Sequence, residues 1–204
     1  MSMKRFFVPT LLSMLAGAAL AAATVGEPAP AFNATDTSGR KVSLADFKGR
    51  TVVLEWTNPG CPFVQKHYRS ANMQAAQRAA VAQGVVWLSV NSTALGDTDY
   101  KAPPDMGAWM QQQRGTPSAT LMDSDGRIGR AYGARTTPHM FVIDSSGRVA
   151  YAGAIDSKPT GTVADIETAT NYVMQAVKEV VAGKPVSVPT SAPYGCSVHY
   201  GAPA

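Results

Sequence analysis

The chain of 204 residues contains only two cysteines, Cys61 and Cys196. Two thiols can form one disulfide bond, so a small fold held together by several disulfides is excluded. The sequence has no cluster of lysine and arginine, which argues against a nucleic-acid partner although the formal net charge is +4. Charged residues make up 16% of the chain and hydrophobic residues 45%, a balance typical of a folded globular protein.

Long apolar runs are also scarce, and the one that approaches the length of a membrane span is Phe6 to Leu20. Lys4 and Arg5 precede it, and small residues that suit a cleavage site follow at 19–23, as in a signal peptide. A single membrane anchor is the alternative, but the run is short and rich in alanine and glycine. We therefore predict a signal peptide over residues 1–23, export to the periplasm or beyond, and no stable membrane insertion after cleavage.

The remaining residues predict one domain over 24–183 and a tail rich in proline, serine and glycine over 184–204. Apolar runs and turn residues predict strands over 31–34, 41–44, 51–56, 85–90, 119–123, 139–144 and 148–153. Helices are expected over 63–83, 106–114, 128–132 and 162–182, with a helical turn at 44–47. Crossover helices make the central strands parallel and the last hairpin adds antiparallel ones, so the sequence predicts an α/β fold around a mixed sheet.

Cys61 lies in the run E-W-T-N-P-G-C-P-F-V (Glu55 to Val64), between a strand and the start of a helix. Backbone N–H groups and the helix dipole favour negative charge there, so the position would stabilise a thiolate. We interpret Cys61 as a nucleophile; a buried inert cysteine or half of a structural disulfide is the alternative. Lys66 and His67 follow on the helix and could add positive potential, although solvated side chains are the simpler expectation.

This order of elements, with Thr137-Pro138 just before a strand, resembles the thioredoxin fold. More closely, G-C-P-F-V and the string R-T-T-P-H-M-F-V-I-D-S-S-G-R (Arg135 to Arg148) resemble the thioredoxin-like AhpC/TSA family of peroxiredoxin-like proteins, over roughly Pro28 to Gly183. The resemblance implies a thioredoxin-like fold with a mixed central sheet flanked by helices. The residues themselves add an N-terminal hairpin around the turn at 37–40 and the C-terminal tail. The resemblance also implies a cis Thr137–Pro138 bond packed beside the reactive cysteine.

The resemblance assigns site roles unevenly. Cys61 matches the nucleophilic cysteine of the thioredoxin motif, but Val64 stands where its partner should be, so no local C-x-x-C disulfide can form. Glu55 matches the buried acid that assists proton transfer, provided it is buried; a solvated carboxylate at the strand end is the alternative. His139 follows Pro138 and is expected near Cys61, where it would stabilise the thiolate or bind a metal, or simply pack as an ordinary histidine.

The peroxidase features of the family are incomplete in this sequence. Asn58 occupies the threonine or serine position three residues before the cysteine, and Pro138 falls where the arginine that contacts peroxide would lie. Thr57 and Arg135 are close enough in the sequence to substitute for them, and Thr137 borders the same site. These departures argue against efficient peroxidase chemistry.

Cys196 is the remaining thiol, and two interpretations stay open. A nucleophilic cysteine that forms a mixed disulfide or a sulfenic acid needs a second thiol to release it, and with Val64 unable to act, Cys196 is the candidate resolving thiol. Alternatively it forms a static clasp with Cys61. A disulfide that closes so long a loop would contribute up to about 4 to 5 kcal/mol.

The leading hypothesis is thus an exported thiol–disulfide oxidoreductase that needs no organic cofactor. It would act on a disulfide or a peroxide and be regenerated by an external thiol reductant. A thiol peroxidase is the runner-up within this class. A copper-binding module with Cys61, His139, Cys196 and His199 as ligands is the alternative from another class, and a tail-clasped fold without chemistry is a third.

Overall fold

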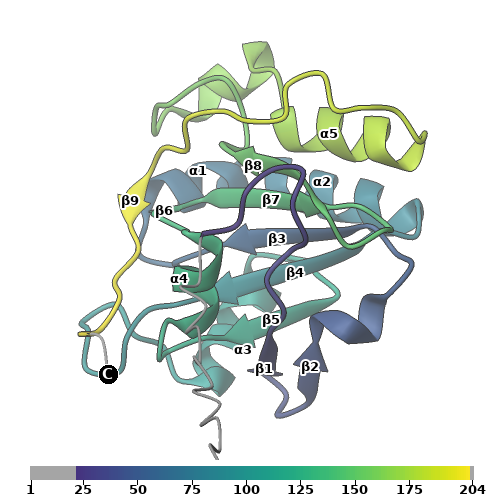
Figure 1. Ribbon diagram of the computed structural model, residues 1–204. Coiled ribbons are helices and arrows are strands. Elements are labelled where there is room, and N and C mark those ends of the chain that lie inside the picture. Colours follow the sequence, from purple (N-terminus) through teal and green to yellow (C-terminus); the bar gives the residue numbers. More distant parts are fainter. Residues whose placement is uncertain (1–21, 203–204) are drawn as a thin grey trace, which may run out of the picture.

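The computed structural model describes residues 22–202, so nearly all of the predicted signal peptide lies outside the described residues. A seven-stranded sheet in the order β2-β1-β5-β4-β3-β7-β8 forms the centre of the protein (Figure 1). Its strands are β1 (Asn33–Asp36), β2 (Lys41–Ser43), β3 (Val52–Trp56), β4 (Val86–Asn91), β5 (Ala119–Met122), β7 (His139–Ile143) and β8 (Val149–Gly153). β3, β4 and β5 are parallel and the other pairings are antiparallel, which confirms the mixed sheet.

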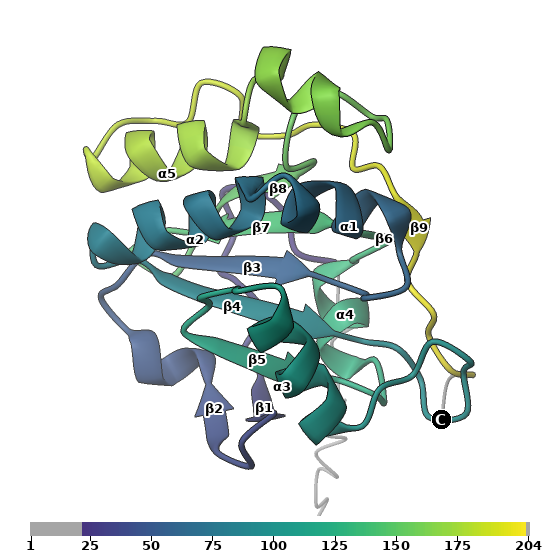
Figure 2. The same cartoon turned by 180° about the vertical axis from the view of Figure 1, so that it is seen from behind.

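Two apolar cores lie on opposite faces of this sheet, because successive strand residues point to opposite sides. The helices are α1 (Pro62–Arg69), α2 (Asn72–Ala82), α3 (Pro103–Gln112), α4 (Arg127–Tyr132) and α5 (Tyr172–Val181), with 3-10 turns η1 (Leu44–Phe47) and η2 (Val163–Thr168). Residues of α1, α2, α3 and α5 share the core of one face, whereas α4 and the N-terminal segment share the other (Figures 1 and 2). All five residues of β3 are buried, as expected of a central strand covered on both faces.

Two of the expected helices are interrupted. The helix predicted over 63–83 is divided into α1 and α2 at Ala71, which has a left-handed φ of 59°. Just before the break, the Ser70 hydroxyl donates to the carbonyl oxygens of Lys66 and His67, and such local bonds compete with the helix. The helix predicted over 162–182 is likewise a 3-10 turn followed by α5, which begins where the Asn171 side chain accepts from the Met174 amide at 3.0 Å.

The helix predicted over 106–114 corresponds to α3, which begins earlier, at Pro103. Proline suits the first turn of a helix, where an N–H group would have no intrahelical partner.

No helix within residues 22–202 combines the length and the hydropathy needed to cross a membrane.

The tail after Gly183 forms a strap along one side of the domain, drawn in yellow in Figure 1. It first runs beside β8, where the Ala152 amide donates to the Pro189 carbonyl at 3.1 Å. The strand β9 (Cys196–Ser197) then pairs antiparallel with β6 (Thr136–Thr137). Beyond β9 the strap reaches the loop after β4, where the Ala94 amide donates to the His199 carbonyl at 2.9 Å. The tail is therefore an integral part of the fold.

The strap crosses β8 at Gly153, and the crossing leaves no room for a side chain. A Cβ atom there would lie 2.6 Å from the carbonyl oxygen and 2.7 Å from the nitrogen of Ser191. The Ser191 hydroxyl also accepts from the Ala154 amide at 2.9 Å, so the strap cannot move away without losing this bond.

We expect Gly153→Ala to lower the free energy of unfolding by about 1 to 3 kcal/mol, because overpacking forces the backbone apart. Urea denaturation would measure this change, and limited proteolysis would show faster cleavage of the tail. Gly161→Ala is the matched control, since nothing lies within 4 Å of a Cβ at that position. An equal stability of the two variants would contradict the tight crossing.

Candidate active site

Cys61 lies at the N-cap of α1, directly after β3 and the turn that follows it. The thiol is only 2% exposed and donates to the Thr137 carbonyl oxygen at 3.0 Å. The Cys61 amide donates to the Asn58 carbonyl at 3.1 Å, and Pro62 begins the helix. The thiol is thus held between the start of α1 and the cis Thr137–Pro138 bond, which is present as predicted.

Cys196 reaches this point from the tail. Its Cα is paired with that of Thr137 across β6 and β9, and its side chain packs against the apolar core that contains Cys61. Burial, followed by the hydrogen bond to Cys61 and the charge of Cys61, raises the pKa of Cys196 to about 12. The two thiols are close together but are not joined by a disulfide.

Glu55 is fully buried on β3, so the solvated alternative for this carboxyl is wrong. Its oxygens accept from the Tyr68 hydroxyl at 2.8 Å, the Trp87 indole at 2.7 Å, the Ser89 hydroxyl at 3.0 Å and the Gln77 amide at 3.1 Å. Burial raises the pKa of Glu55 above its ordinary value, and the four hydrogen bonds oppose that rise. Because burial has the larger effect, Glu55 can keep a proton at a higher pH than an exposed glutamate can.

The threonines and the proline of the predicted site are all buried. The Thr57 amide donates to the Val90 carbonyl at 2.9 Å, and Thr137 provides the carbonyl that accepts from Cys61. Neither threonine hydroxyl has a hydrogen-bond partner within the described part of the chain. Thr57 and Thr137 therefore offer two unused polar atoms on the segments that flank Cys61 and Pro138.

The structure does not bring His139 or Arg135 to Cys61. Along β7, Met140 belongs to the core that contains Cys61, whereas His139 packs on Phe141 of the opposite core, with ring centroids 4.6 Å apart. Strand alternation thus turns His139 to the far face of the sheet. Burial and the nearby Arg135 lower the pKa of His139 to about 4. Both side chains line a cavity of about 610 Å³ behind the sheet.

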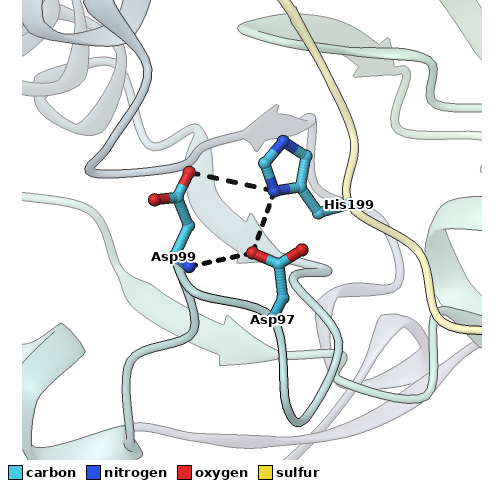
Figure 3. A group of neighbouring side chains, drawn as sticks. All are labelled: Asp97, Asp99 and His199. Atoms are coloured by element: carbon cyan, nitrogen blue, oxygen red, sulfur yellow. Dashed lines mark hydrogen bonds and ion pairs between the residues drawn. The ribbon is translucent and has the colours of Figure 1, made fainter.

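The four candidate copper ligands do not converge either. His199 lies instead against the loop after β4, with Nδ1 3.0 Å from Asp97 Oδ1 and 3.8 Å from Asp99 Oδ2 (Figure 3). Asp97, Asp99 and His199 are the one group of three potential metal ligands found within residues 22–202. These contacts fasten the end of the strap to the loop after β4.

A buried polar cluster beside the two thiols was missed by the sequence analysis. Lys66 and His67, which were expected to be solvated, are at most 1% exposed. They face Asp156, which follows β8, and the tail residue Tyr194. The tyrosine ring packs edge-on to Phe63 with centroids 5.9 Å apart. No sequence pattern signals these contacts, because they join segments that lie far apart along the chain.

Comparison with known proteins gives a consistent result. A model of the AhpC/TSA family matches residues 25–152, which is more than half of the chain. Two curated relatives, the thiol-disulfide oxidoreductases ResA of Bacillus thuringiensis and Bacillus cereus, are each 26% identical over 115 residues. The alignment covers 51% of this chain and 66% of each relative, so the chain spans slightly less than two thirds of their length.

Solved structures share the fold over most of the chain. A hypothetical protein from Sinorhizobium meliloti is 26% identical with a TM-score of 0.73, covering 89% of this chain and 97% of that one. An uncharacterized conserved protein from Geobacillus kaustophilus is 24% identical with a TM-score of 0.75, covering 89% and 94%. A putative thiol:disulfide interchange protein DsbE from Chlorobium tepidum is 24% identical with a TM-score of 0.52, covering 64% and 85%. The thioredoxin-like fold is confirmed.

The buried Glu55 carboxyl makes the stability of the protein depend on pH. Between the ordinary pKa of 4.5 and the raised pKa of the folded state, the folded protein holds one more proton than the unfolded chain. The free energy of unfolding therefore falls as pH rises through this window, by up to about 1.4 kcal/mol per pH unit.

We expect Glu55→Gln to lose this dependence, so that its stability relative to wild type increases from pH 5 to pH 8. Urea denaturation at several pH values would measure the difference. Glu167→Gln, which removes an exposed carboxylate, is the matched control and should follow wild type. Parallel curves for wild type and Glu55→Gln would show that Glu55 is ionised in the fold throughout this range.

Proposed function

The chain belongs to the AhpC/TSA family, and on that premise we propose that it is an exported thiol–disulfide oxidoreductase in which Cys61 is the nucleophile and Cys196 the resolving thiol. The observation that carries the proposal is the pairing of Cys196 with Thr137 across β9 and β6, which brings the tail cysteine to the residue whose carbonyl accepts from the Cys61 thiol. A local dithiol is impossible because Val64 replaces the second cysteine of the motif. The tail provides the missing thiol.

The proposed reaction has two exchange steps. The Cys61 thiolate attacks one sulfur of a substrate disulfide, which forms a mixed disulfide and releases the other sulfur as a thiolate that takes up a proton. The Cys196 thiolate then attacks Cys61, which forms the Cys61–Cys196 disulfide and releases the second substrate thiol. The substrate gains two electrons and two protons, and an external thiol reductant returns them to the protein.

The electrostatics of Cys196 support this order of events. Burial, the hydrogen bond to Cys61 and the charge of a Cys61 thiolate raise the pKa of Cys196 to about 12, so the Cys196 thiol is protonated at neutral pH. Once Cys61 is bound covalently, its charge disappears and this cause of the high pKa is removed. The Phe63 N–H group, which lowers the pKa of Cys196, remains in place. Cys196 should therefore ionise more readily once Cys61 has reacted, although burial, the largest cause of its high pKa, remains.

Glu55 is proposed to hold and release a proton during these steps. Burial raises its pKa, so it can hold a proton at a higher pH than an exposed glutamate can, as a proton-transfer group requires. The Tyr68 hydroxyl that donates to Glu55 belongs to a side chain in the same core cluster as Cys61. Thr57, Thr137 and Pro138 would shape the space in which the substrate sulfur meets Cys61.

The proposed location is outside the cytoplasm, with residues 1–23 as the signal peptide, 24–183 as the domain and 184–204 as the tail. Lys4, Arg5 and the following apolar run support the signal peptide. An exported protein works where disulfides persist, which suits a redox pair that cycles through one. Sulfur carries both electrons, so the proposed reaction needs no organic cofactor.

We expect Cys61→Ser to abolish the reduction of a protein disulfide, because the attacking thiolate is lost. Cys196→Ser should retain the first step and accumulate the mixed disulfide, which mass spectrometry would detect as an adduct on Cys61. In wild type, one equivalent of the oxidised substrate should leave the Cys61–Cys196 disulfide. Equal activity of wild type and Cys61→Ser would contradict the proposal.

The same variants distinguish the proposed oxidoreductase from a thiol peroxidase and from a protein whose Cys61–Cys196 disulfide is only a static clasp. One equivalent of peroxide should give a Cys61 sulfenic acid in Cys196→Ser and a disulfide in wild type, and a faster reaction with peroxide than with disulfides would favour the thiol peroxidase. A Cys61–Cys196 disulfide that is present on isolation and resists mild reductant would favour the static clasp.

A further inference from the structure

The position of the Cys196 thiol depends on how the strap enters β9. Gly195, just before Cys196, has a φ of 135° and passes so close to the Thr137 carbonyl that a Cβ atom would overlap it. This residue offers no side chain to hold the strap in place. The nearest side chain that can do so before Cys196 is that of Tyr194.

Tyr194 is held at its hydroxyl and along its ring. The hydroxyl donates to Asp156 Oδ1 and lies 3.2 Å from His67 Nε2. The ring packs edge-on to Phe63, the second residue of α1, and Lys66 Nζ lies 5.6 Å from the ring centroid. The tyrosine thus joins the strap to the same first turn of α1 that presents Cys61.

The groups that hold the hydroxyl are costly to bury. Asp156 is 2% exposed and its Oδ2 atom has no hydrogen-bond donor within residues 22–202. Lys66 Nζ lies 3.7 Å and His67 Nε2 3.9 Å from that oxygen, and Lys66 donates to the Lys158 carbonyl at 2.9 Å. Buried ion pairs are poor sources of stability, because desolvation offsets the attraction between the charges. Their best-supported use is to fix one arrangement among several.

We propose that Tyr194 is a positioning residue for the resolving step, because the bond from its hydroxyl to Asp156 fixes the strap in the register that places Cys196 against Cys61. The inference rests on the proposed function, in which Cys196 attacks the Cys61 sulfur. It concerns this step alone: the Cys196 thiolate forms a bond to Cys61 Sγ, and the substrate sulfur leaves with the electron pair of the mixed disulfide. Tyr194 takes no part in the first attack by Cys61.

Positioning acts on rate because an intramolecular attack depends on how often the two atoms meet in the reactive geometry. Without the hydroxyl, the ring still packs on Phe63, but the strap can shift along β6 and carry Cys196 away. The attack of Cys61 on a substrate is not slowed by this change. The two steps should therefore respond differently to the same substitution.

The test is Tyr194→Phe, followed by rapid mixing with an oxidised model peptide. We expect the second-order rate of mixed-disulfide formation to stay within about twofold of wild type, and closure of the Cys61–Cys196 disulfide to slow by about tenfold or more. If closure is also about tenfold less favourable at equilibrium, the reduction potential rises by about 30 mV. A merely structural role would leave this potential and the ratio of the two rates unchanged.

Tyr200→Phe is the matched control. It removes another tyrosine hydroxyl of the strap, one that donates to the Ala134 carbonyl at 2.8 Å on the other side of Cys196. Closure in this variant should stay within about threefold of wild type. Asp156→Asn keeps an oxygen acceptor without the charge, so it should slow closure less than Tyr194→Phe does.

Closure at the wild-type rate in Tyr194→Phe would overturn the inference and leave the proposed function intact. Equal slowing of closure in Tyr194→Phe and Tyr200→Phe would also overturn it, because the loss of any hydroxyl contact of the strap would then slow closure of the Cys61–Cys196 disulfide. Failure of wild type itself to form the Cys61–Cys196 disulfide would instead overturn the proposed function and, with it, the step that Tyr194 serves. If Tyr194→Phe does not fold, closure in Asp156→Asn at the wild-type rate or faster would be the contradicting result.

Discussion

The antiparallel pairing of β9 with β6 is the contact on which the arrangement of the two thiols depends. It places Cys196 opposite Thr137, whose carbonyl accepts from Cys61, so one residue contacts both thiol-bearing segments. The two cysteines are 135 positions apart in the sequence, and this short pairing brings them to the same part of the fold. The site is therefore a product of tertiary structure: β3 and α1 supply one half, and the strap supplies the other.

The sequence was sufficient for the parts of the molecule that follow local rules. Apolar runs identified the strands of the mixed sheet, and the position of Cys61 between a strand and a helix was correct. The boundaries failed where a local bond overrode the pattern, as at Ser70, which competes with the helix between α1 and α2. His139 was placed by proximity in the chain to Pro138, but strand alternation turns it to the other face.

The cluster around Asp156 could not be predicted for a different reason. Lysine and histidine near the start of a helix normally face solvent, and only burial by the distant Tyr194 and Asp156 reverses that expectation. Glu55 was recognisable because its position matches a family motif, whereas Lys66 and Asp156 belong to no motif. The family match itself ends at residue 152, before Asp156 and the strap begin.

The strap also changes where the protein can be shortened. By sequence pattern, the domain ends with the last helix near Gly183, and a chain cut there would appear complete. In the folded molecule, that cut would remove a strand, uncover the Cys61 sulfur and leave Lys66, His67 and Asp156 facing an open surface. Such a truncated chain would present a single exposed thiol to any oxidant or disulfide in solution. The folded unit of this protein thus extends beyond the last helix that the sequence pattern marks.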